Sequence, residues 1–314
     1  MKISVYITSY NQKDYLKTAI DSVLAQTLRP HEIIVIDDCS TDGSQELISE
    51  YVRKFPDIIK PIFHQVNTGV TQSRIDALAA VTGHYVSYLD GDDRYFPTKL
   101  EKEAALIKDN PGVQLVFSNF YFFNEKLNRQ QVWIKNTLPP TGHIFKDVFS
   151  RNFPNQTLFR NELVDYNAWK DIGFHDPAIN LYEDFEVKIR LTKRLKAAYQ
   201  PEPLVEYRLH DKGLSRSKKE RHLEALNYVY SKNMPLLDDL NPAEKKTVLK
   251  RVYYYLGTFT SLLLISTLKD FITGKASFSS LTGSIKRYFQ RPGNCIVTIK
   301  MIIFKIKRII IRNL

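Results

Sequence analysis

An alternation of strands and helices over the first 110 residues constrains the fold of this chain more than any other feature. Four short runs rich in β-branched residues are each followed by a segment whose apolar residues recur at helical spacing. The expected strands are 2–7, 32–36, 59–65 and 84–89, and the expected helices are 14–27, 44–55, 71–81 and 97–110. This repeat predicts an α/β fold with a Rossmann-like, mostly parallel sheet, right-handed crossovers and flanking helices.

Polar residues follow each of the four expected strands. They are Thr8–Asn11, Asp37–Asp38, Asn67–Gly69 and Asp90–Asp92, in chain order. The carboxyl ends of parallel strands lie along one edge of an open α/β sheet, and ligands bind there. We therefore expect the four clusters to converge on one binding site.

Three acids, Asp90, Asp92 and Asp93, surround Gly91 at the end of the fourth expected strand. A turn or a helix cap accounts for one Asp, and for a single Asp it is the simpler interpretation. Three carboxylates within four positions repel one another, and a divalent cation removes that repulsion. Mg²⁺ and Mn²⁺ take oxygen ligands and keep positions open for phosphates. The cluster therefore predicts a metal that holds a diphosphate, with Gly91 leaving room for the ligand.

Five motifs occur in order along the chain: "ISVYITSYN", "EIIVIDDCSTDGS", "NTGVTQSRIDALAAVTGHYVSYLDGDD", "IGF" at 172–174 and "YEDFEVKIRL". Together they resemble the inverting family-2 glycosyltransferases with the GT-A fold, of the bacterial polysaccharide type. A DxD motif alone is a weak signal, whereas the ordered set is specific. The resemblance implies transfer of a sugar, with inversion, from a nucleotide-diphosphate sugar to an acceptor hydroxyl. A UDP-sugar is the commonest donor in such enzymes.

The resemblance also implies roles for residues near the nucleotide. Thr8, Tyr10 and Asp38 would surround the base, and Arg74 would help to hold the nucleotide. The simpler interpretation of Asp38 is a turn or an N-cap, although Asp42 and Ser44 already serve that purpose. By residue type and position alone, Arg74 would lie on a solvated helix face.

The implied metal shell consists of Asp92, Asp90 and His210, with Mn²⁺ or Mg²⁺ as the cofactor. Asp92 would bind the metal directly, and Asp90 would lie closer to the ribose. Asp93 is a third acid that leaves the register of the motif open. His210 follows a probable strand in "VEYRL", although a lone histidine is usually a surface residue.

Glu183 and Asp184 begin an expected helix over 180–195. The helix dipole favours acids in the first turn, which accounts for one of the two. The resemblance makes Asp184 the general base toward the acceptor hydroxyl and places Glu183 beside the substrates. Because a solvated Asp has a pKa of about 3.9, we expect burial and Glu183 to raise the pKa of Asp184.

Positive charge is concentrated at the C-terminus. Residues 271–314 carry nine Lys or Arg and no acid, so the other residues hold +2 of the net charge of +11. Within this stretch, residues 296–314 are predicted to form a basic amphipathic helix that lies on an anionic membrane surface. The alternative is an ordinary docking helix with a solvated face. The uncharged run 252–268 is short for a membrane span and favours a buried or interfacial helix.

These patterns predict a GT-A domain over 1–217 and a helical, membrane-associating region over 218–314. We expect a cytoplasmic protein at the inner face of the cell membrane, a possibly lipid-linked saccharide acceptor and no nucleic acid. The alternatives are a sugar nucleotidyltransferase or a non-catalytic membrane-binding or nucleic-acid-binding module. The stretch "TSYNQKD" after the first strand lacks the glycine-rich loop of a nucleotidyltransferase and the DxD of a haloacid-type phosphatase.

Overall fold

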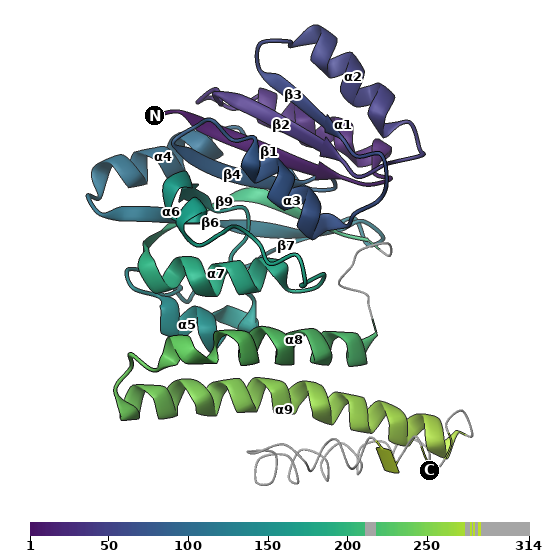
Figure 1. Cartoon of the computed structure of the whole chain (residues 1–314), viewed down its shortest axis with the longest axis vertical. Coiled ribbons are helices and arrows are strands. Elements are labelled where there is room, and N and C mark those ends of the chain that lie inside the picture. The colour runs from purple at the N-terminus through teal and green to yellow at the C-terminus, as the bar shows by residue number, and fades with distance from the viewer. Residues whose placement is uncertain (211–217, 274–276, 278, 280–281, 284–314) are drawn as a thin grey trace. The chain divides into compact units, whose positions relative to one another are not determined.

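The computed structural model describes residues 1–210, 218–273, 277, 279, 282 and 283 (Figure 1). The chain forms two compact units. The first contains Met1–Val148 and Phe153–Arg216, and the second contains Phe149–Asn152 and the described residues from 218 onward. The predicted division into functional domains at 217 stays a prediction.

The first unit is built on a nine-stranded sheet. The strands are β1 (Ile3–Ser9), β2 (Glu32–Asp37), β3 (Ile59–Phe63), β4 (Tyr85–Asp90), β5 (Arg94–Tyr95), β6 (Val113–Asn124), β7 (Arg129–Val132), β8 (Leu163–Asp165) and β9 (Lys196–Leu209). The helices along this part of the chain are α1 (Lys13–Leu24), α2 (Ser44–Lys54), α3 (Val70–Ala79), α4 (Lys99–Asp109), α5 (Phe145–Phe149), α6 (Tyr166–Asp171) and α7 (Glu183–Arg194). The four expected strands, the four expected helices and the helix at Glu183 are confirmed.

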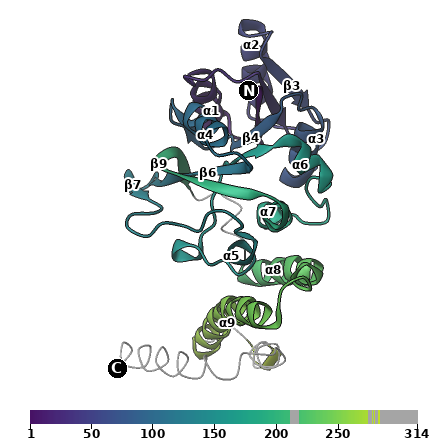
Figure 2. The same ribbon diagram turned by 90° about the vertical axis from the view of Figure 1, so that its left-hand side faces the viewer.

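The strand order is β3-β2-β1-β4-β8-β6-β9-β5, and β7 pairs with β6. Strands β1 to β4 are parallel neighbours, as in one half of a Rossmann-like sheet. β8 joins β4 and β6 by antiparallel pairing, and β6 and β9 form a long parallel pair. Figure 2 shows α1 and α4 on one face of the sheet and α3 and α6 on the other. The predicted α/β class is confirmed, with antiparallel strands added beyond β4.

The register of the sheet aligns the polar strand ends. Every residue of β1 and β2 is buried, as expected for short apolar strands covered on both faces. Thr8 at the end of β1 stands opposite Asp90 on β4, and Ser9 stands opposite Asp37 on β2. Parallel pairing therefore brings three of the four polar clusters to one edge.

Gly91 is required by the packing of protein against protein. Its N–H donates to the Thr8 carbonyl at 2.9 Å. A Cβ at this position would lie 2.8 Å from that carbonyl oxygen and 2.7 Å from Oε1 of Gln12. The expectation that Gly91 leaves room for a ligand was wrong, because the end of β1 already fills the space.

The second unit contains two long helices, α8 (Lys219–Asn233) and α9 (Pro242–Ile272), which lie side by side in both views (Figures 1 and 2). Leu226 and Val229 of α8 and Val252 of α9 are buried. The uncharged run 252–268 lies within α9. Among the described residues, no helix combines the length and the apolar character needed to span a bilayer. The predicted amphipathic helix at 296–314 lies outside the described residues.

Candidate active site

Asp90, the last residue of β4, is held from two sides. Thr8 Oγ1 donates to Oδ1 of Asp90 at 3.2 Å, and Nη2 of Arg74 donates to the same oxygen at 2.7 Å. Arg74 comes from α3 and is 5% exposed, so the solvated helix face considered for it was wrong. Three of the predicted residues therefore meet at the edge of the sheet.

Arg74 also links the two acidic motifs. Its Nε lies 3.8 Å from Oε1 of Glu183, the first residue of α7, and its guanidinium lies 4.7 Å from the centroid of the Tyr88 ring. Burial alone would lower the pKa of Arg74, but Asp90, Tyr6 and Glu183 raise it well above its ordinary value. A charged guanidinium therefore stands between Asp90 and Glu183 inside the protein.

Asp92 and His210 are in direct contact. Nε2 of His210 lies 2.8 Å from Oδ2 of Asp92, and the His210 side chain is 9% exposed, so it is not an ordinary surface histidine. Burial and the neighbouring Asp90 raise the pKa of the Asp92 carboxyl, and His210 offsets part of that effect. Burial is thus the main reason that the neutral form of Asp92 is favoured.

Asp93 has a different role from the other two acids of its motif. It is 2% exposed, and its Oδ1 accepts a hydrogen bond from the Arg208 N–H of β9 at 2.8 Å. Its Oδ2 is buried and has no hydrogen bond among the described residues. Burial, Asp92 and Asp90 raise the pKa of Asp93 well above its usual range. Asp93 ties the loop to the sheet, which leaves Asp90 and Asp92 as the more accessible pair.

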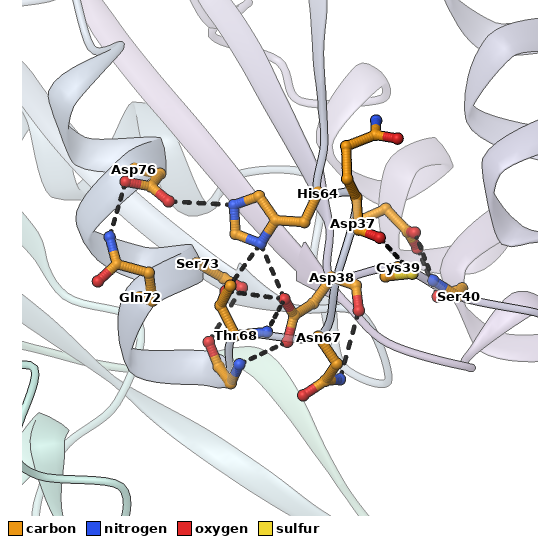
Figure 3. Close-up of polar contacts among 12 residues, drawn as sticks. Asp37, Asp38, Cys39, Ser40, His64, Asn67, Thr68, Gln72, Ser73 and Asp76 are labelled. Carbon is orange, nitrogen blue, oxygen red and sulfur yellow. Dashed lines mark hydrogen bonds and ion pairs between the residues drawn. The ribbon is translucent and has the colours of Figure 1, made fainter.

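Asp38 lies directly after β2 and binds the start of α3 (Figure 3). Its Oδ1 accepts from the Thr68 N–H at 2.8 Å and lies 2.8 Å from Nδ1 of His64, while its Oδ2 accepts from the Gly69 N–H at 2.7 Å. Burial would raise the pKa of this carboxyl, but these hydrogen bonds hold it below its usual value. The interpretation of Asp38 as a turn or N-cap residue within 37–44 was wrong, because its carboxylate binds the backbone of Thr68 and Gly69, directly before α3.

Tyr10 stands apart from the other predicted residues. It lies in the bend after β1 and is 49% exposed. Within the described part of the chain, its side chain forms no hydrogen bond with Thr8, Asp38 or Arg74. Its predicted contact with the nucleotide base stays a prediction.

The two acids that begin α7 have opposite environments. Burial would raise the pKa of Asp184, but Lys188, Arg160 and Arg74 lower it far below the usual range. Burial and Asp184 raise the pKa of Glu183, against the effect of Arg74. The expected rise in the pKa of Asp184 was therefore wrong, because the sequence did not reveal the cations around it.

Comparison with known proteins identifies the family. Residues 4–166, about half of the chain, match glycosyl transferase family 2. An uncharacterized glycosyltransferase of Methanocaldococcus jannaschii is 31% identical over 225 residues, which cover 70% of this chain and 75% of that relative. The chain belongs to glycosyl transferase family 2.

Two further relatives match this family-2 chain over shorter stretches. An uncharacterized glycosyltransferase of a Nostoc species is 48% identical over 113 residues, which cover 36% of this chain and 35% of that relative. The putative teichuronic acid biosynthesis glycosyltransferase TuaG of Bacillus subtilis is 40% identical over 108 residues, which cover 34% of this chain and 42% of TuaG. The match thus spans about a third of the Nostoc protein and less than half of TuaG.

Two solved structures share the fold of this family-2 chain. TarS of S. aureus in complex with UDP-GlcNAc has a TM-score of 0.61 at 17% identity, and the match covers 92% of each chain. The mannosyltransferase PcManGT of Pyrobaculum calidifontis, in complex with GDP-Man and Mn²⁺, has a TM-score of 0.60 at 15% identity, with 96% of this chain and 85% of that chain covered. At these identities the likeness establishes the GT-A fold alone, which confirms the predicted fold class.

The predicted metal ligands of this family-2 chain are not preassembled as a cluster. Among the residues that the structure describes, no three His, Cys, Asp or Glu side chains lie together in a group that could hold an ion. Asp92 and His210 nevertheless offer oxygen and imidazole donors that suit Mn²⁺. Burial and, after it, the neighbouring acids raise the pKa values of Asp92 and Asp93, and a bound cation would favour their ionised forms. These residues therefore fit a divalent ion.

Sequence reasoning missed two cations of the site. Lys188 is fully buried in α7, and its position between Phe185 and Ile189 on the inward face of the helix was a signal that could have identified it. The Arg160 guanidinium lies 3.8 Å from the centroid of the Tyr207 ring and has no hydrogen bond or ion pair among the described residues. No sequence pattern marks Arg160.

Replacing Asp38 with Asn should lower the free energy of unfolding by about 1–3 kcal/mol at pH 7, because the part-buried N–H groups of Thr68 and Gly69 lose a charged acceptor. The folded-state pKa of Asp38 is lowered. Its stabilisation is therefore complete above the unfolded pKa of about 3.9 and is lost as the pH falls toward the lower folded pKa. Urea unfolding between pH 5.5 and 3 should show the difference between the two proteins shrinking.

Asp57→Asn is the matched control for this measurement, because Asp57 is exposed and makes no side-chain contact in the described part of the chain. Its unfolding curve should follow that of the wild type throughout. A wild-type advantage over Asp38→Asn that stayed constant down to pH 3 would contradict the ionised role of Asp38.

Proposed function

We propose that this chain is an inverting glycosyltransferase that transfers a sugar from a nucleotide-diphosphate sugar to an acceptor hydroxyl in cell-surface polysaccharide synthesis. Family membership supports glycosyl transfer. The similarity to the putative teichuronic acid glycosyltransferase supports a polysaccharide product. The donor, the acceptor and the use of a metal are parts of the proposal.

The observation that carries this proposal is the junction made by Arg74. Nη2 of Arg74 lies 2.7 Å from Oδ1 of Asp90, and its Nε lies 3.8 Å from Oε1 of Glu183. The two acids are about ninety residues apart in sequence, yet both face this one buried guanidinium. Asp90 belongs to the predicted metal and diphosphate motif, and Glu183 adjoins the predicted base. A sugar transfer needs both motifs at one place, because the leaving group and the acceptor act on the same carbon atom.

The donor in the proposal is a nucleotide-diphosphate sugar, with a UDP-sugar favoured. The similar structures were solved with UDP-GlcNAc in one case and GDP-Man with Mn²⁺ in the other, and these ligands support this class of donor. Thr8, Tyr10 and Asp38 would surround the base. Arg160, which has no ion pair among the described residues, is a cation available to the diphosphate.

Asp92, Asp90 and His210 would hold Mn²⁺ or Mg²⁺. Such an ion, when bound, neutralises the charge that develops on the departing diphosphate. Oδ1 of Asp90 already accepts hydrogen bonds from Thr8 and Arg74, so its other oxygen is the one open to an ion or to the ribose.

Asp184 would act as the general base. The acceptor hydroxyl gives its proton to a carboxylate oxygen of Asp184, and its oxygen forms a bond to the anomeric carbon. The bond from that carbon to the diphosphate breaks at the opposite face, and the diphosphate takes the electron pair. Because the pKa of Asp184 is lowered, the proton moves late, when bond formation has made the hydroxyl acidic.

The acceptor in the proposal is a saccharide attached to a membrane lipid. The basic residues of 271–314 would bind an anionic membrane surface and keep the enzyme at the inner face of the cell membrane. We propose no nucleic-acid partner, because the first 270 residues carry a net charge of only +2.

A panel of nucleotide sugars, tested by thermal unfolding with and without Mn²⁺, examines the donor and the metal together. The correct donor with Mn²⁺ should stabilise the protein by about 2.7 kcal/mol at a concentration 100-fold above its Kd. Asp92→Ala should lose this gain, while the exposed Asp57→Ala should keep it. A chelator that left both stabilisation and transfer unchanged would refute the metal role.

Replacing Asp184 with Asn should lower kcat by about 10²- to 10⁴-fold, because the acceptor hydroxyl loses its base. Donor KM should stay within about twofold of the wild-type value, because the amide leaves the donor site intact. Initial rates of transfer, measured with the donor found above, test this expectation. Asp171→Asn, at an exposed position before the loop that leads to α7, is the control and should retain full activity. Equal kcat in wild type and Asp184→Asn would exclude Asp184 as the base.

Removing residues 274–314 should abolish binding to anionic membranes and spare the chemistry. The full chain should cosediment with phosphatidylglycerol vesicles at low salt and not with phosphatidylcholine vesicles, since each basic residue adds about 1 kcal/mol at an anionic surface. The truncated chain should stay in the supernatant and still hydrolyse the donor slowly. Loss of donor hydrolysis together with membrane binding would instead favour a non-catalytic binding module.

A further inference from the structure

Lys188 places a buried positive charge directly behind the proposed base. Its side chain is 0% exposed, and its Nζ lies 3.2 Å from Oδ2 of Asp184, 3.3 Å from the Tyr88 hydroxyl and 3.4 Å from Oε1 of Glu162. An ammonium group has three N–H donors, and here it faces three oxygen atoms. Burial would lower the pKa of Lys188, but Glu162, Tyr88 and Asp184 raise it well above its usual range. Lys188 is therefore a charged residue that donates to Asp184 and Tyr88 and forms an ion pair with Glu162.

The two oxygens of Asp184 differ in their surroundings. Oδ2 faces Lys188, whereas Oδ1 makes no hydrogen bond within the described residues. The side chain as a whole is 32% exposed. One oxygen is thus fixed from inside the protein, and the other is open toward solvent.

The anchors of Lys188 belong to the sheet that carries the rest of the site. Glu162 is 0% exposed and stands just before β8. Tyr88 lies on β4, two residues before Asp90. The centroid of its ring lies 5.7 Å from Nζ of Lys188 and 4.7 Å from the Arg74 guanidinium. A side chain that bridges Tyr88 and Asp184 therefore fixes the first turn of α7 relative to the strand that ends in Asp90.

We propose that Lys188, anchored by Glu162 and Tyr88, is the positioning residue of the general base, holding Oδ2 of Asp184 and leaving Oδ1 to accept the acceptor proton. This inference rests on the proposed glycosyl transfer. During the reaction the proton passes from the acceptor hydroxyl to Oδ1 as the new carbon–oxygen bond forms. Lys188 keeps its own protons and touches no substrate.

A purely structural role explains Lys188 poorly. Taking two charges out of water costs several kcal/mol per ion, and apolar side chains of similar volume often stabilise a core at least as well. Lys99 and Glu103 provide an internal comparison, because they form a second buried ion pair at the same i, i+4 spacing, with both side chains 0% exposed. That pair makes no contact with Asp184.

Several charged groups besides Lys188 act on Asp184. Arg160, from the segment before β8, and Arg74, on α3, lower its pKa together with Lys188. Glu183, its neighbour on α7, and the buried Glu162 are the nearby acids, and each has its own pKa raised partly by Asp184. Removing the Lys188 charge therefore leaves two cations and two acids around the base, and the pKa of Asp184 should move upward.

The test compares Lys188→Met with Lys99→Met in the full chain. Lys188→Met should lower kcat at least about tenfold while donor KM stays within about twofold, because orientation of the base matters after the donor has bound. The wild-type kcat should stay constant between pH 4.5 and 8, because the pKa of Asp184 lies far below this range, whereas loss of the Lys188 charge should raise that pKa and make kcat fall toward pH 4.5. Lys99→Met, which removes an equally buried lysine, should leave donor KM and the pH profile unchanged.

A second comparison separates positioning from general destabilisation. In an Asp184→Asn background, Lys188→Met should reduce the residual kcat less than about twofold, because the group that it positions has gone. If Lys188→Met does not fold, Lys188→Met/Glu162→Gln removes both buried charges and should show the same kcat loss. An unchanged pH profile in the folded variant, or equal losses of kcat for Lys188→Met and Lys99→Met, would overturn the proposal.

The outcomes also distinguish this inference from the function on which it rests. Loss of kcat in Asp184→Asn with full kcat in Lys188→Met would reject the role of Lys188 and keep glycosyl transfer. Equal kcat in wild type and Asp184→Asn would reject the base assignment itself. Absence of transfer from every nucleotide sugar in the wild type would reject the proposed function.

Discussion

The ion pairs of Arg74 hold the two halves of the site together. Asp90 ends a strand in the parallel part of the sheet, and Glu183 begins a helix after a long excursion of the chain, so backbone pairing does not connect them. Their carboxylates face one buried guanidinium that is packed on Tyr88. Without that cation, two acids would remain close together in a poorly solvated region, which electrostatic repulsion and desolvation both oppose. The position of α7 against the sheet thus depends on charge as much as on apolar packing.

Two neighbouring acids with opposite environments are a recognised arrangement in active sites, because the environment assigns them different roles. Here the burial of Glu183 favours its neutral form, while Lys188 and Arg160 favour the ionised form of Asp184. A base with a lowered pKa is always deprotonated near neutrality, and it takes a proton only from a group that has become acidic. In the proposed reaction, the acceptor oxygen acquires that acidity as it bonds to the anomeric carbon. The arrangement therefore favours a constantly available base over a strong one.

The parallel half of the fold was predictable because periodicity and strand-end chemistry are local properties of a sequence. Thr8 and Asp90 could be brought together from the β-α alternation alone, since parallel register follows from it. The antiparallel insertion of β8 and the ion pair between Lys188 and Glu162 depend on contacts that no local pattern encodes. The family motifs point to Asp184 as the base, which stays a prediction, and the predicted direction of its pKa shift was wrong. Motif reasoning finds the acids, and the surrounding cations become visible only in the folded chain.

The surroundings of the acids differ between the two parts of the site. At Asp92 and Asp93, burial and then the neighbouring acids raise both pKa values. Around Asp184 the cations outweigh the acids, so its pKa is lowered. A surplus of negative charge attracts a divalent ion, and that ion in turn attracts a diphosphate, whereas a surplus of positive charge keeps a carboxylate ionised without a metal. In the proposed reaction, the anionic leaving group and the anionic base would therefore be compensated by different kinds of cation.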